Sequence, residues 1–104
     1  MTELEQIVNQ IKLSTDFQIN RIKLREKIQT DLHIAYNQGL FKITTDLLAF
    51  LATWPDDEIF LEDIYENPIK INRKELLELA RQHYYSIMNE WHIQFNELSK
   101  IRKV

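Results

Sequence analysis

Residues 72–101 read NRKELLELARQHYYSIMNEWHIQFNELSKI and contain neither Gly nor Pro, and this stretch decides the fold. Apolar side chains recur along it at alternating spacings of three and four residues, which is typical of one face of a helix. They are Leu77, Ala80, Tyr84, Ile87, Trp91, Leu98 and Ile101, with Phe95 able to turn in beside Gln94. Asn72 and Glu75 form a capping box at the start. The stretch predicts a helix of roughly 43 Å.

The first third of the chain predicts a second long helix. Thr2 and Glu5 can form another capping box, and residues 4–11 place apolar side chains on one face. Further along, the apolar positions lie on a stripe rotated away from the first: Phe17, Leu24, Ile28 and Leu32. Either one helix of about 35 residues has two apolar faces, or the helix breaks near Ser14. We favour a continuous or gently kinked helix that ends with Gly39 in a left-handed conformation.

The middle of the chain predicts shorter elements. Thr44 or Thr45 begins a helix that ends near Trp54, because Pro55 follows. Residues 59–71 fit either a short helix followed by an extended link, or a hairpin across a turn at Asn67 and Pro68. An isolated two-stranded hairpin is only marginally stable, so we favour the short helix.

The composition agrees with a single domain over residues 1–104. Apolar residues make up 44% of the chain and charged residues 28%, with one Gly and no Cys. Scarce Gly favours helices, because hairpin turns often require it. The predicted fold class is therefore all-α: an elongated, coiled-coil-like helical bundle with long N- and C-terminal helices packed antiparallel. A minor β-hairpin near residues 59–71 is the alternative within that class.

The N-terminus lacks the pattern of a signal peptide, and no apolar run approaches the ~20 residues that span a bilayer. We therefore expect an intracellular, cytoplasmic protein without a membrane partner. The residue usage follows codons rich in A and T, which would suit a small phage structural or accessory protein in the host cytoplasm or the virion.

The chain offers no recognisable chemistry. Without Cys, thiolate catalysis and cysteine-based metal sites are excluded, and the three histidines do not form a metal-binding motif. Carboxylate pairs such as Glu62 with Glu66 suit a solvated helix surface. We expect a protein that is not an enzyme and has no cofactor, no metal site and no catalytic residues.

Nucleic-acid binding is the alternative function. Residues 61–81 could form a helix-turn-helix with Arg73, Lys74 and Arg81 near one edge. However, residues 37–72 contain two basic and seven acidic side chains, a local balance of −5 within a chain of net charge −3. Such a patch repels phosphates, so a nucleic-acid partner is disfavoured.

Protein–protein interaction is the predicted function. The last helix is rich in aromatic residues, which are enriched at interface centres. The predicted partner-binding residues are Ile19, Ile22, Tyr85, Trp91 and Phe95. They would make the chain an assembly or adaptor protein that binds another protein or itself, as a homo-oligomer or a subunit of a complex.

Overall fold

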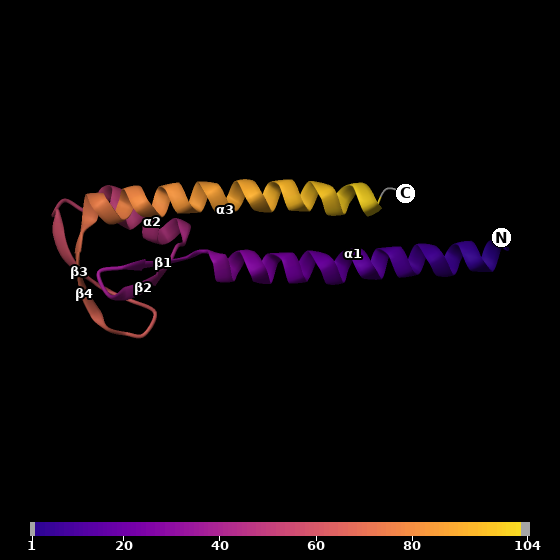
Figure 1. The fold of residues 1–104 in the computed structure, drawn as a ribbon, viewed down its shortest axis with the longest axis horizontal. Coiled ribbons are helices and arrows are strands. Elements are labelled where there is room, and N and C mark those ends of the chain that lie inside the picture. Colours follow the sequence, from indigo (N-terminus) through magenta and orange to yellow (C-terminus); the bar gives the residue numbers. More distant parts are fainter. Residues whose placement is uncertain (1, 103–104) are drawn as a thin grey trace.

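Two long antiparallel helices and a small head built from two β-hairpins and a short helix make up the fold (Figure 1). The structure is a computed structural model that describes the backbone of residues 2–102 and the side chains of residues 2–100. Its elements are α1 (Glu3–Asp31), β1 (His33–Tyr36), β2 (Gly39–Lys42), α2 (Thr45–Thr53), β3 (Glu58–Glu62), β4 (Pro68–Asn72) and α3 (Arg73–Arg102). The fold is therefore an extended α+β arrangement, and the predicted all-α class is wrong.

Helix α1 is continuous through Ser14, as predicted, because nothing there interrupts its backbone hydrogen bonds. Both bonds of the capping box form, with Glu5 N donating to Thr2 Oγ1 and Thr2 N donating to Glu5 Oε2. The helix ends at Asp31, however, well before Gly39. The predicted end was wrong because residues 33–42 form a hairpin instead.

The β1–β2 hairpin pairs His33 with Lys42 and Tyr36 with Gly39. Its two-residue turn consists of Asn37 and Gln38, whose φ angles of 50° and 71° are those of a primed hairpin turn. Gly39 therefore does not take the left-handed role that the sequence predicted for it. It is needed for space, since a Cβ atom there would lie 2.7 Å from Ile69 Cγ1.

Helix α2 begins as predicted. Leu47 N donates to Thr44 Oγ1 at 3.1 Å, so Thr44 is the N-cap, and Trp54 caps the other end before Pro55.

Residues 59–71 form the hairpin that the sequence left as the second alternative, and the favoured short helix is wrong. Strands β3 and β4 pair antiparallel from Glu58 with Asn72 to Glu62 with Pro68. The hairpin packs on other elements, which supplies the stability that an isolated hairpin lacks. Leu40 N donates to Asp63 Oδ2, and Ile64 N donates to the Leu40 carbonyl, so the two hairpins are joined.

The predicted helix-turn-helix is absent from the described residues, because residues 58–72 are strands and a turn. Arg73, one of its proposed DNA contacts, turns inward and is only 8% exposed. Its guanidinium donates to the carbonyls of Leu51 (2.6 Å) and Asp56 (3.0 Å) and to the Asp57 carboxylate (3.3 Å). The side chain thus ties α2 and the following loop to the start of α3.

The head has its own core. Phe41, Leu51, Ile71 and Leu76 are buried together, one each from β2, α2, β4 and α3. The start of α3 therefore belongs to the head, and the rest of this helix extends away from it. Glu75 N donates to Asn72 Oδ1 at 3.0 Å, the predicted cap of that helix.

The two long helices lie antiparallel, as predicted, around a second cluster that contains Leu24, Ile28, Leu32 and Ile87. His83 Nε2 donates to the Asp31 carbonyl at 2.6 Å and so joins α3 to the end of α1. The molecule measures 67 × 23 × 18 Å. None of the helices over the described residues carries an apolar stretch that could cross a membrane.

Candidate functional site

One face of α1 carries a row of apolar side chains that no other part of the described chain covers. We call it the outer stripe, and it consists of Leu4, Ile7, Val8, Ile11, Ile19 and Ile22. Each is exposed, from 45% for Ile19 to 71% for Leu4. Residues three, four or seven apart lie on the same side of a helix, so the six form one row. Exposed apolar rows of this length mark interaction sites on soluble proteins.

The opposite face of α1, which we call the inner face, packs on α3. Leu24 and Ile28 are buried there against Ile87, and Phe17 is buried further along the same face. Ile22 and Leu24 are two residues apart, so their side chains point about 160° apart on the helix. Packing on α3 therefore leaves the outer stripe in solvent.

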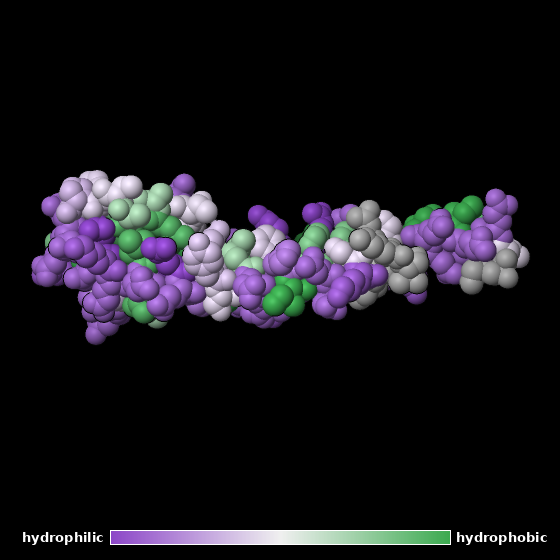
Figure 2. All heavy atoms as spheres, turned by 90° about the horizontal axis from the view of Figure 1, so that it is seen from above, coloured by the Kyte–Doolittle hydropathy of each residue, from purple (hydrophilic) through white to green (hydrophobic). Residues whose placement is uncertain are grey.

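The N-terminal end of α1 projects beyond the end of α3 (Figure 1). Every residue from 3 to 16 is exposed, including the four apolar residues at the start of the outer stripe. Figure 2 shows hydrophobic atoms gathered along one edge of this projecting end, far from the head. Helices this isolated are only marginally stable in water, because most helix stability comes from packing an apolar face. The projecting end thus has an apolar face that packing on a partner would stabilise.

The structure separates the five predicted contact residues into two groups. Ile19 and Ile22 belong to the outer stripe, whereas Tyr85, Trp91 and Phe95 lie on α3. Trp91 is half-buried and packs against the cluster around Leu24, so part of it contributes to folding.

Phe95 contacts Phe17 edge to face, with ring centroids 6.5 Å apart. Tyr85 is 69% exposed and contacts the neighbouring Tyr84 ring. The prediction also omitted the four outer-stripe residues between 4 and 11. Their spacing was visible in the sequence, and the signal was that their stripe does not continue into the one formed by Phe17 and Leu24.

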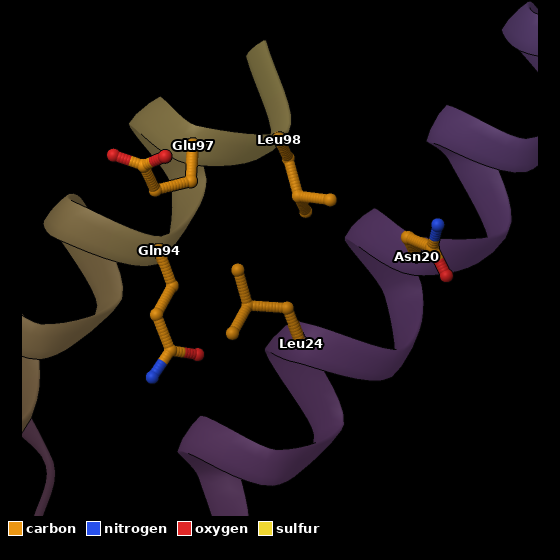
Figure 3. A pocket seen from close by; sticks show the side chains of 5 residues that line it. All are labelled: Asn20, Leu24, Gln94, Glu97 and Leu98. Atoms are coloured by element: carbon orange, nitrogen blue, oxygen red, sulfur yellow. The ribbon is translucent and has the colours of Figure 1, made fainter. Parts of the chain in front are cut away.

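Two shallow grooves run along the pair of long helices, because only two helices pack there and both flanks stay open. One groove of about 310 Å³ is lined by Met88, Trp91, His92 and Phe95 of α3. The other, also about 310 Å³, is lined by residues of both helices (Figure 3). Leu24 and Leu98 point toward each other across it, with Gln94 beside them. Both grooves are open, and neither gathers charged groups that could perform chemistry.

Each of the three histidines has a hydrogen-bond partner within the molecule. His33 Nδ1 donates to the Thr30 carbonyl at 2.8 Å, and His83 joins the two helices as described above. His92 lies 3.3 Å from Asn96 Nδ2 on the same helix. Within the described part of the chain, no three His, Cys, Asp or Glu side chains gather as a metal ion would require.

The acidic segment before α3 contributes to the structure of the head. Asp63 is buried and accepts hydrogen bonds from the backbone N–H groups of Asn67, Leu40 and Tyr65. These bonds, led by the one from Asn67, lower the pKa of the Asp63 carboxyl, although its burial acts in the other direction. Asp57 pairs with Arg73 and lies 3.7 Å from Lys74. Two of the seven acidic side chains of residues 37–72 are thus engaged in holding the turn and the start of α3.

The chain matches no known protein family, and neither a curated protein nor a solved structure is significantly similar to it. The candidate site therefore rests on the outer stripe and on the exposed aromatic residues of α3.

Proposed function

We propose that the chain is a non-enzymatic protein–protein interaction module with an assembly or adaptor role, and that the outer stripe of α1 is its main contact surface. The observation that carries this proposal is the row of six exposed apolar side chains, four of them within residues 3–16, where every residue is exposed. Burying these side chains on a partner would remove apolar surface from water, which is the main driving force of protein association.

The two buried clusters of the molecule support the proposal. The head and the inner face of α1 have buried clusters of their own, so the outer stripe is not needed to complete a core. Tyr85 on α3 offers a second exposed aromatic contact away from these clusters. A partner can therefore cover the outer stripe without any rearrangement of the fold.

Site-specific photo-cross-linking in the cells that naturally make the protein tests the proposal. Ile11 is replaced by a benzophenone-bearing phenylalanine analogue, and covalent products are identified by mass spectrometry. Gln6 is the matched control position, because it lies on the same half of α1 but on the opposite face. We expect strong adducts from position 11, either to a second copy or to another protein, and few from position 6.

Equal, background-level labelling from both positions would refute the proposal. Circular dichroism of both variants checks that α1 stays helical. A Tyr85→Ala variant tests whether α3 contributes, since loss of this exposed ring should weaken association without changing the thermal melt.

A further inference from the structure

We propose that the outer stripe binds the outer stripe of a second copy, with the two α1 helices antiparallel. This inference rests on the function proposed above and names its partner. Three features of α1 support it: the spacing of its apolar residues, the area that they offer and the distribution of its charges.

The spacing is that of a helix–helix seam. The positions Leu4, Val8, Ile11, Thr15, Gln18 and Ile22 follow one another at alternating steps of four and three residues. Such alternation keeps one stripe facing a partner helix along its whole length. Four of these positions are apolar, and Ile7 and Ile19, the other two residues of the outer stripe, flank the seam and widen it. The two polar positions, Thr15 and Gln18, lie together in its second half, opposite Ile11 and Val8 of the other copy when the seam is centred, and they lower the affinity rather than add to it.

The area is close to what a specific dimer needs. Six large apolar side chains per copy, each offering on the order of 80 Å², would bury about 1,000 Å² in total, the lower end of specific interfaces. The seam runs over residues 4–22, or about 27 Å of helix. We therefore expect a dimer that dissociates as the protein is diluted, with a Kd in the micromolar range.

The charges of α1 select the antiparallel orientation. Residues 3–16 contain three acidic side chains and one basic one, whereas residues 17–31 contain four basic and two acidic side chains. The first half thus has a net charge of −2 and the second half of +2. An antiparallel pair places each acidic half beside the basic half of the other copy, while a parallel pair would bring like charges together. The helix dipoles are also opposed favourably in the antiparallel pair.

The shape of the molecule permits this arrangement. The head lies at the C-terminal end of α1, beyond the last stripe residue, and α3 covers the opposite face. Centring the seam on its middle brings Leu4 of one copy beside Ile22 of the other, and the two heads then lie at opposite ends. Twice the 67 Å length, less an overlap of about 30 Å, gives a dimer about 100 Å long. A parallel dimer would have nearly the length of one copy.

Disulfide trapping tests the pairing and its direction, and the chain suits it because it contains no Cys. Leu4→Cys and Ile22→Cys are made as separate variants with tags of different size, mixed and oxidised in a glutathione buffer. Antiparallel pairing predicts that the mixed disulfide between the two variants dominates. The matched control pair is Gln6→Cys with Asn20→Cys, which has the same central position on α1 but lies on the other face. We expect little disulfide from the control pair.

Several results would overturn the inference. Disulfides that form mainly between two copies of the same variant would show a parallel pair. Equal disulfide formation in the control pair would show random collision. A single-chain mass by sedimentation from about 1 µM to about 500 µM would show that the chain does not self-associate. In that last case, the proposed interaction function would still stand if photo-cross-linking from position 11 captured a different protein.

Discussion

Replacing Arg73 by Ala should destabilise the fold strongly, because this side chain is buried and holds three elements together. Its bonds to the carbonyls of Leu51 and Asp56 are the important ones, since each hydrogen bond from a charged donor contributes ~1.5 to 3 kcal/mol. The bond to Asp57 contributes little, because that carboxylate is more than half exposed. The expected loss in free energy of unfolding is therefore about 3 kcal/mol. For a domain of this size, that lowers Tm by roughly 12 to 24 °C.

Urea denaturation followed by far-UV circular dichroism measures this loss. Lys74→Ala is the matched control, because Lys74 is the next residue and also approaches Asp57 but is exposed. We expect the control to change stability by less than ~0.5 kcal/mol. Arg73→Lys should fall between the two, since an ammonium group cannot reach both carbonyls with the geometry of a guanidinium. An Arg73→Ala variant as stable as Lys74→Ala would refute the structural role assigned to Arg73.

Three further predictions concern the head and the inner face of α1. The pKa of Asp63 is lowered in the folded state, so its contribution to stability is complete above about pH 4 and is lost as the pH falls through the lowered value. Asp63→Asn should therefore weaken the acid dependence seen in pH-dependent urea melts, and an unchanged dependence would contradict this role. Gly39→Ala should lower the free energy of unfolding by about 1 to 3 kcal/mol, because the added methyl group would overlap the Ile69 side chain. Gln38→Gly should raise it by up to ~1 kcal/mol, because glycine adopts the positive φ of this position without strain. Equal urea midpoints for the two variants would contradict both roles. Ile28→Ala should lower the free energy of unfolding by about 2 to 5 kcal/mol, because this side chain is fully buried. Ile22→Ser should leave the thermal melt of the monomer unchanged, because Ile22 is exposed. Equal losses of stability in the two variants would place the outer stripe in the core.

The long helices could be predicted from the sequence because their signals are local. The capping box at Thr2 and the alternating apolar residues up to Leu98 act within a few turns, and no Gly or Pro interrupts either helix. Their antiparallel packing followed from their similar lengths. The exposure of the outer stripe was harder to predict, since the same spacing would fit a face buried against a third helix.

The head could not be predicted in the same way, because its hairpins depend on contacts between distant residues. Asn37 and Gln38 form the first turn, yet the Gly beside them is typical of a helix end as well. The second hairpin is held by Leu40, whose backbone bonds to residues 63 and 64 more than twenty positions away. The local propensity of a segment does not reveal such distant partners, and here tertiary packing makes these residues form strands.

Small-angle X-ray scattering of the wild-type chain over a concentration series tests antiparallel pairing through the outer stripe, because it reports mass and length together. We expect the mass to rise from one chain to two as concentration increases, while the maximum dimension grows from near 67 Å to about 100 Å. An Ile11→Asp variant should keep the mass and length of one chain at every concentration. A wild-type chain that stays at one copy, or a dimer no longer than one copy, would contradict antiparallel pairing through the outer stripe.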